Sequence, residues 1–293
     1  EYFFTRERIT EENMKLNIKE EKIPVLKQLR AVVSSKDWWI VIAFFFLFQL
    51  GGLIKNGSMG YYCYAMFGAT TVAEAGTFQS MLGLIGGIPT AAGMILAWPI
   101  AAKLGKKNSI VIGFIVAVLG GLISFIDTSS FILVCTGVVL KGIGSIPAMY
   151  VSLALLSDVL DHLEARNGFR SDGFTMSVYG AIMVGMTGLG TGVVNGLLGA
   201  GGYDFENLFV QSDGAKNMVV WCFLALELIC YAVLIVIMLF TNVEMYVKQD
   251  HETILAHQKA AVIAAGGEWI EPSERLRQEQ EQADLKAEET RKE

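Results

Sequence analysis

The stretch Ser157–Gly173, SDVLDHLEARNGFRSDG, is dense in charge and lies between two long apolar segments, 131–156 and 174–199. Its first two acids, Asp158 and Asp161, are three residues apart. Residues three and four apart share one face of a helix, so both carboxylates are expected on the same side of a helix that continues out of the apolar segment. A segment this polar between membrane-length helices serves as a connector or as a gate.

Outward from this stretch, the chain alternates long apolar segments with short polar ones. It is 53% hydrophobic, with a mean hydropathy of +0.47. Crossing the hydrocarbon of a bilayer takes about 20 apolar residues in a helix. Six segments are long enough: about 38–67, 78–101, 109–126, 131–156, 174–199 and 217–240. The sequence therefore predicts an all-α integral membrane protein with six transmembrane helices, whose first partner is the lipid bilayer.

Lysine and arginine gather on one side of these predicted spans. The loops 68–77, 127–130 and 200–216 contain Lys216 as their one basic residue, whereas the other connections and the tail are rich in Lys and Arg. Because cytoplasmic loops carry the excess of basic residues, we expect both termini of this chain on the cytoplasmic side of a cell membrane.

Three regions follow from this topology. Residues 1–36 are expected to form a cytoplasmic linker, 37–241 the six-helix bundle, and 242–293 a charged, helical cytoplasmic tail. The chain opens EYFFTRERIT, which reads as the exit of a preceding apolar helix, so we expect a piece of a longer protein. The tail is interpreted as a solvated appendage (a polar helix over about 244–264, then a second from Pro272), with a regulatory docking element as the alternative.

Several functional classes have no support. The four cysteines lie inside apolar segments without motif spacing, which is typical of packing residues. Three histidines form no cluster with them, so we expect no metal site and no cofactor. We find no phosphate-binding glycine loop and no nucleophile triad, and hence no catalytic residues. The sequence predicts neither an enzyme nor a nucleic-acid partner.

Three ionisable residues fall inside the apolar segments: Lys55, Lys141 and Glu227. A charge in the middle of a bilayer costs about 2.5–3.5 kcal/mol on insertion scales, so such residues usually face a cavity or a partner. Both lysines are candidates for a substrate cavity. The alternatives are snorkelling to the outer surface for Lys55 and a buried structural pair for Lys141. Glu227 is expected either to pair with a lysine or to be protonated.

Aromatic and charged side chains supply further candidates. Tyr150 and Tyr179 lie where rings and hydroxyls would suit a sugar, whereas the tyrosines at 61, 62 and 64 fit the interfacial aromatic belt. At the cytoplasmic mouth, opposite charges predict a gate of breakable ion pairs, since exposed pairs contribute only about 0–1 kcal/mol each. A plain topogenic loop is the alternative. The predicted gate consists of Asp158, Asp161, Arg166 and Arg170.

Glycines predict where helices approach closely. Gly188, Gly192 and Gly196 recur every fourth residue, which leaves one face of that span without side chains. Six spans with both ends inside match one half of a twelve-helix transporter, and such halves contain two inverted three-helix repeats.

The order of several short motifs resembles one transporter family. Ser157–Gly173 is similar to the signature A-D-x-x-D-Y-x-x-x-K-T-G-x-R-x-E-G of the glycoside–pentoside–hexuronide:cation symporters, the melibiose-carrier-like family of the major facilitator superfamily (MFS). Lys55-Asn56-Gly57 with Tyr61-Tyr62 resembles R/K-N-G-x-x-x-Y-Y of helix seven, and Lys141-Gly142-Ile143-Gly144 resembles R-G-I-G of helix ten. The resemblance reaches to about residue 245 and implies the C-terminal half of that fold.

The resemblance also implies positions for the site. Substrate contacts would come from Lys55, Asn56, Lys141, Met149, Tyr150, Tyr179, Met183 and Val184. Two positions differ from the family: His162 stands where a tyrosine is usual, and Val184 where many members have a lysine. The family's cation-binding aspartates belong to the first six helices.

The resemblance therefore implies one half of a secondary active transporter that carries sugar together with Na⁺ or H⁺ by alternating access. Its expected partners are the N-terminal six-helix half and a small sugar. Two alternatives stay open: the same fold with a non-sugar or amphiphilic cargo, and a non-transporting membrane fragment or partner.

Overall fold

The computed structural model describes residues 24–271, 273–274, 277–278 and 281. Most of the predicted linker 1–36 and of the second tail helix lies outside these residues. Residues 24–250 form one compact unit, and the chain from His251 onward belongs to another. All the regular structure in the described residues is helical.

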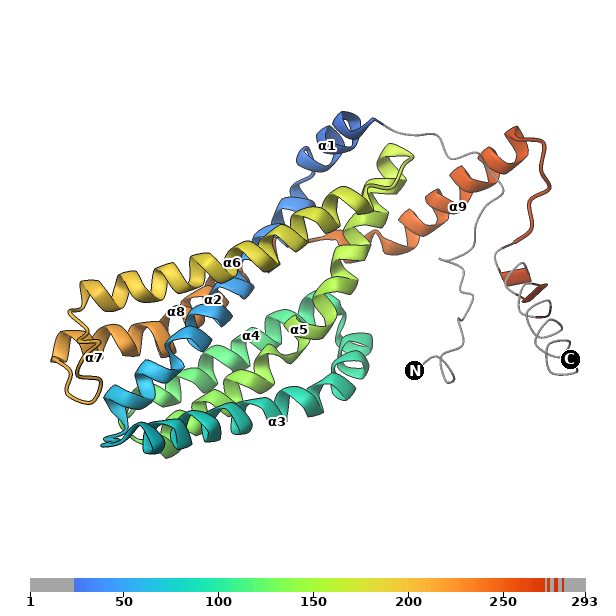
Figure 1. Cartoon of the computed structure of the whole chain (residues 1–293). Helices are drawn as coiled ribbons and strands as arrows, with labels where there is room; N and C mark the ends of the chain where they lie inside the picture. The colour runs from blue at the N-terminus through green and yellow to red at the C-terminus, as the bar shows by residue number, and fades with distance from the viewer. Residues whose placement is uncertain (1–23, 272, 275–276, 279–280, 282–293) are drawn as a thin grey trace, which may run out of the picture. The chain divides into compact units, whose positions relative to one another are not determined.

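Six long apolar helices make up the unit of residues 24–250 (Figure 1). A short helix α1 (Val25–Val33) precedes them, and α9 (Val247–Ala264) follows. Five spans are single helices with at most a short 3₁₀ end: α2 (Lys36–Met66), α3 (Val72–Leu104), α4 (Lys106–Leu122, extended by η2, Ile123–Phe125), α5 (Phe131–Asn167) and α6 (Asp172–Ala200). The sixth span contains α7 (Asp213–Val220), a π-helical turn η3 (Trp221–Ala225), α8 (Leu226–Leu239) and the 3₁₀ turn η4 (Val243–Met245). The predicted six-span, all-helical fold is confirmed.

The polar stretch 157–173 is more helical than a connecting loop. Helix α5 continues through its acids to Asn167, and the chain then turns at Gly168, whose φ of 72° lies in the left-handed region that suits glycine. Helix α6 begins four residues later at Asp172. Asp158 and Asp161 are therefore held on a rigid helix that extends beyond the apolar segment.

The packing of the helices follows two interlocked triplets. Helix α5 packs against α3 and α4, and α2 packs against α6 and α8, while α4 and α8 join the two groups (Figure 1). If α2, α3 and α4 are matched to α5, α6 and α8, the most extensive contacts map onto one another: α5 with α3 and α4 corresponds to α2 with α6 and α8. The first helix of each triplet thus packs mainly against the second and third helices of the other, which is the arrangement that an inverted repeat requires.

Glycines allow the closest helix crossing, between α4 and α5. A Cβ on Gly144 would come within 3.0 Å of the backbone of Gly113 and Ala117. The glycine face of α6 makes no such close contact in this unit. A Cβ on Gly188, Gly192 or Gly196 would meet no described atom within 4 Å. That face is open in this unit.

Two apolar cores lie one above the other along the bundle. The first contains Phe45, Ala148 and Leu228 among its buried residues, and the second contains Ile54, Val138 and Leu224. The boundary between the two cores therefore falls between residues 45 and 54 on α2, between 138 and 148 on α5, and between 224 and 228 on the sixth span. Lys55 adjoins this boundary, and Lys141 and Glu227 fall within it.

Candidate functional site

The three ionisable residues predicted inside the spans meet in one buried cluster. Lys141 on α5 forms an ion pair with Glu227 Oε2 on α8. Lys55 on α2 places its Nζ 3.7 Å from Glu227 Oε1. Lys141 is 3% exposed and Glu227 is 2% exposed, whereas the Lys55 side chain is 25% exposed. Three helices therefore place two ammonium groups on one carboxylate, in a cluster that opens at Lys55.

Neighbouring side chains complete this cluster. The Tyr231 hydroxyl, one helical turn after Glu227, donates a hydrogen bond to Glu227 Oε1 at 2.9 Å. The Lys141 Nζ lies 5.9 Å from the centre of the Phe223 ring, within the range of a cation–π contact. The π-helical turn Trp221–Ala225 ends just before Glu227. One extra residue in a turn rotates the following side chains by about 100°, which changes the face on which Glu227 lies.

Both lysines of the cluster lie well inside their helices. Lys55 is 11 residues before the end of α2, and Lys141 is 10 residues after the start of α5. At 1.5 Å per residue both Cα atoms are about 15 Å from those helix ends. The Lys55 ammonium points toward Glu227 rather than toward a helix end, which favours the cavity interpretation of Lys55 over snorkelling.

The other predicted substrate contacts divide into exposed and inward-facing residues. Asn56, Met149, Tyr150 and Val184 are exposed, Val184 by 77%. The Tyr150 hydroxyl donates to the Thr90 carbonyl at 3.2 Å and so links α5 to α3. In contrast, two residues of α6 are partly buried and pack against the first apolar core: Tyr179, whose ring lies 4.8 Å from that of Phe45, and Met183.

Three of the four predicted gate residues make ion pairs within this unit. Asp158, 6% exposed, binds the Lys106 ammonium of α4 through both carboxylate oxygens at 2.7 Å. Arg170 binds Asp161 at 2.7 Å and Asp172 at 2.6 Å. Arg166 is exposed, and no ion pair joins it to a described residue. The contacts described here hold the ends of α4, α5 and α6 together; whether they also open and close remains a prediction.

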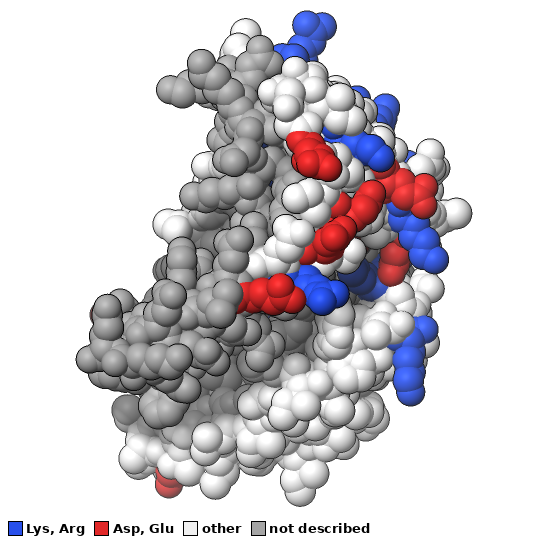
Figure 2. All heavy atoms as spheres, turned by 90° about the vertical axis from the view of Figure 1, so that its right-hand side faces the viewer, with Lys and Arg blue, Asp and Glu red and all other residues white. Residues whose placement is uncertain are grey.

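Nearby carboxylates also determine the protonation state of Arg170. Burial alone would lower the pKa of its guanidinium, but the carboxylates of Asp172, Asp161 and Glu164 outweigh burial and raise the pKa above its ordinary value. Arg170 is therefore a permanent cation. Figure 2 shows the charged face of the molecule, where acidic and basic side chains lie side by side.

The sequence reasoning missed a cap that links the fourth helix to the end of the sixth span. Glu244 accepts hydrogen bonds from the backbone N–H groups of Lys106, at 2.6 Å, and Lys107, at 3.1 Å. The Lys107 ammonium in turn donates to the carbonyls of Leu239 and Thr241. Each helix end thus receives the charge that its dipole favours. The basic run 103–107 was the available signal, but nothing in its spacing indicated an acid more than 130 residues away.

His162, which stands where the resembled family usually has a tyrosine, contacts two residues near the start of α9. Its Nδ1 lies 2.8 Å from Asp250 Oδ2, and its ring stacks on Tyr246 at 5.4 Å. This pair fixes the first turn of α9 to the end of α5.

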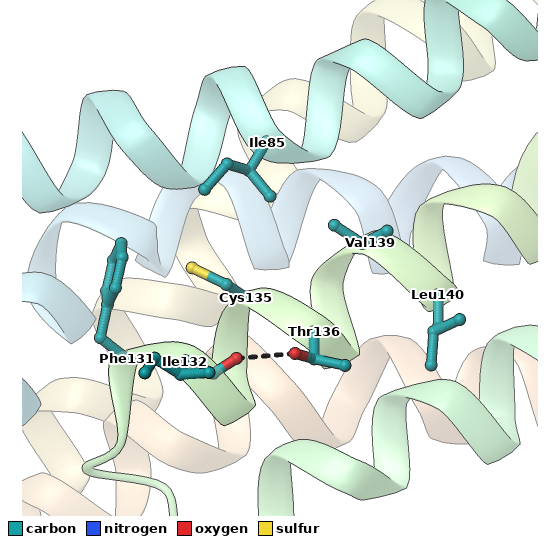
Figure 3. A pocket seen from close by; sticks show the side chains of 7 residues that line it. All are labelled: Ile85, Phe131, Ile132, Cys135, Thr136, Val139 and Leu140. Carbon is teal, nitrogen blue, oxygen red and sulfur yellow. Dashed lines mark hydrogen bonds between the residues drawn. The ribbon is translucent and has the colours of Figure 1, made fainter.

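An apolar pocket of about 430 Å³ lies between α3 and α5 and is lined by none of the three ionisable residues of the cluster (Figure 3). Ile85 faces it from α3, and the α5 residues are Phe131, Ile132, Cys135, Thr136, Val139 and Leu140. The one hydroxyl drawn there, that of Thr136, donates to the carbonyl of Ile132 in its own helix. A sugar needs several convergent polar groups, which this lining lacks.

Among the described residues, no group of three His, Cys, Asp or Glu side chains is arranged to hold a metal ion.

Six membrane-length helices in two interlocked triplets, with charged residues buried inside the bundle, are the arrangement of a multi-pass membrane protein. A family model described as MFS/sugar transport protein matches residues 1–245. The chain belongs to this family, which confirms the predicted MFS sugar-transporter membership and the prediction that it is not an enzyme.

The chain also has a curated relative. The chain is similar to the isoprimeverose transporter of Lactiplantibacillus pentosus, with 26% identity over 240 residues. The match covers 80% of this chain and 48% of the relative, so the chain spans about half the length of that transporter.

Proposed function

We propose that this chain forms the C-terminal six-helix half of a sugar:cation symporter of the glycoside–pentoside–hexuronide type. The relative that it matches is a transporter of isoprimeverose, which favours a glycoside as cargo. The proposed coupling ion is Na⁺ or H⁺, with its main ligands in the N-terminal half. The basic residues flanking the spans support a plasma-membrane protein whose described termini face the cytoplasm.

One observation carries this proposal: α3 and α6 present open faces. In their most apolar windows only 17% of α3 residues and 22% of α6 residues are buried, against 50% for α5. Gly83 and Gly87 on α3, like Gly188, Gly192 and Gly196 on α6, would meet nothing described within 4 Å of a Cβ. Faces of small residues allow close helix approach, and lipid does not require them. They therefore suit packing against a second helical bundle.

In this arrangement the sugar binds between the two halves near the middle of the membrane. The exposed residues Asn56, Met149, Tyr150 and Val184 and the opening at Lys55 are the proposed contacts from this half. Lys141, Tyr179 and Met183 support them from behind. Asp158, Asp161, Arg166 and Arg170 are the proposed cytoplasmic gate.

The test is counterflow of radiolabelled glycosides into proteoliposomes that contain the full-length protein, with and without Na⁺ and at two pH values. We expect saturable uptake that depends on one of the two ions. Gly192→Leu should abolish uptake, because its side chain would separate the two halves. The control is Val236→Leu on α8: this residue is exposed by 55% and lies outside the glycine face of α6, so uptake should be retained. No glycoside uptake by folded protein would refute the sugar proposal.

An amphiphilic cargo is the second candidate, and the large exposed apolar side chain of Val184 favours it. Uptake of a lipid-like solute, with no glycoside uptake, would select this candidate. Absence of any uptake would favour a non-transporting membrane partner.

A further inference from the structure

The short helix α1 presents an apolar strip that the described part of the chain leaves largely exposed. Its sequence, VLKQLRAVV, places Val25, Leu26, Leu29 and Val33 within about 100° of one another around the helix axis. Leu26 is 77% exposed and Val25 is 72% exposed. Val32, at the edge of the strip, is buried in the first apolar core and holds α1 to the bundle. An exposed apolar surface with a polar border marks a site of contact with a membrane or a protein.

The charges that border this strip are all positive. Lys27 and Arg30 lie beside it on α1, Lys36 begins the next helix, and all three residues are exposed. Residues 24–36 contain no Asp or Glu. The first acid that follows, Asp37 on α2, is half-buried. The strip therefore fits an occupant that is apolar inside and negatively charged at its surface.

Aromatic side chains place α1 at the level of a membrane surface. Trp39, in the first turn of α2, is 51% exposed, and its Nε1 donates to the Val33 carbonyl at 2.9 Å. Phe240, at the end of the sixth span, is 58% exposed, and the Lys36 ammonium lies 5.8 Å from the centre of its ring. Exposed aromatic rings at the ends of spans are typical of the interfacial belt. Two residues separate α1 from α2, which keeps α1 at this end of the bundle (Figure 1).

We propose that α1 lies in the membrane–water interface and binds anionic phospholipids. The apolar strip then enters the boundary between headgroups and acyl chains, to a depth of about 5–10 Å. Lys27 and Arg30 reach the lipid phosphates, because long basic side chains extend along an apolar surface toward the headgroups. The cytoplasmic leaflet carries the negative surface charge, and it is the leaflet at this end in the proposed orientation.

This inference goes beyond the proposed transport function, because it assigns a lipid ligand to a segment outside the proposed sugar site. The bilayer as a whole surrounds the six spans, whereas this site selects lipids by their charge. A protein surface, either of the N-terminal half or of the chain before α1, is the alternative occupant, and the experiment distinguishes it from lipid.

The first measurement is the affinity of the purified full-length protein for phosphatidylglycerol and for phosphatidylcholine with the same acyl chains, by native mass spectrometry. We expect phosphatidylglycerol to bind more tightly. Arg30→Gln should weaken its binding about fivefold, and Lys27→Gln combined with Arg30→Gln about 25-fold, since each basic side chain near an anionic surface contributes a factor of about five. Glutamine is nearly as good a helix former as lysine and arginine, so α1 is retained. Lys103→Gln, an equal charge loss at an exposed site outside α1, should leave the preference unchanged.

The second measurement locates the apolar strip. A nitroxide is attached at Leu26→Cys in the full-length protein, in vesicles of phosphatidylcholine with phosphatidylglycerol, and the wild type treated in the same way gives the background of the native thiols. We expect molecular oxygen, which concentrates in the acyl-chain region, to reach the label more readily than a water-soluble nickel reagent does.

Three results would overturn the proposal. Equal affinity for the two lipids, or an unchanged phosphatidylglycerol affinity in the double variant, shows that α1 does not select anionic lipid. A label that the nickel reagent reaches freely shows a solvated linker. A label shielded from both reagents shows that protein covers the strip. Because neither measurement involves transport, failure of the symporter proposal in counterflow leaves this one standing.

Discussion

Replacing Glu227 by glutamine should destabilise the full-length protein more than any other change in the buried cluster. The substitution leaves Lys141, 3% exposed, without its counter-charge, and Lys55 gains no alternative acid among the described residues. Breaking a buried ion pair by removing one partner costs about 3–5 kcal/mol.

The reverse substitution, Lys141→Met, should cost less. Glu227 then keeps the Tyr231 hydroxyl at 2.9 Å, and the Lys55 ammonium, 3.7 Å away, can move into the vacated place. The loss is of the order of one charged hydrogen bond, about 1.5–3 kcal/mol. The asymmetry between the two variants follows from the two-to-one ratio of lysine to glutamate.

Melting temperatures of the detergent-solubilised wild type, Glu227→Gln, Lys141→Met and the double variant provide the measurement. The double variant should be more stable than Glu227→Gln alone, since an apolar side chain tolerates burial that an unpaired ammonium does not. If Lys141→Met lowers the melting temperature as much as Glu227→Gln does, Lys55 does not share the carboxylate and the reasoning fails.

Three other changes test the packing and the cytoplasmic ties, each by the melting temperature of the full-length protein. Gly144→Ala should cost about 1–3 kcal/mol because its Cβ collides with the backbone of α4. Gly105→Ala should cost about 1–3 kcal/mol, since φ 86° with ψ 156° is a region open essentially to glycine. Asp250→Asn should lower stability by about 0.5–1.5 kcal/mol by weakening its contact with His162; an unchanged melting temperature would show that this contact contributes nothing.

The sequence predicted the spans well because membrane length and hydropathy are local properties. Each predicted segment coincides with a helix, and the differences lie at the ends, where polar turns such as Asp158–Asn167 extend the helix past the apolar segment. Hydropathy marks where lipid contact stops, whereas hydrogen bonding and the turn at Gly168 determine where the helix stops.

The partners of charged residues were predicted poorly because pairing depends on tertiary distance. Glu227 was expected either to pair with a lysine or to be protonated, but the sharing of one carboxylate by two lysines requires the relative positions of α2, α5 and α8. Asp158 was assigned to a gate with the arginines of its own segment. The structure pairs it with Lys106, a residue of α4, which packs closely against α5.

The positions of the ion pairs and hydrogen bonds between helices indicate how a half of this kind would move. At the charged end, Lys106–Asp158 and the Glu244 cap join α4, α5 and the end of the sixth span. Inside the bundle, the ion cluster joins α2, α5 and α8. Helices fixed at two levels resist bending against one another, whereas the small-residue faces of α3 and α6 have no such ties among the described residues. The proposed alternating access therefore requires this half to move as one body along the faces of α3 and α6, with Lys55 exposed to the solute at the interface.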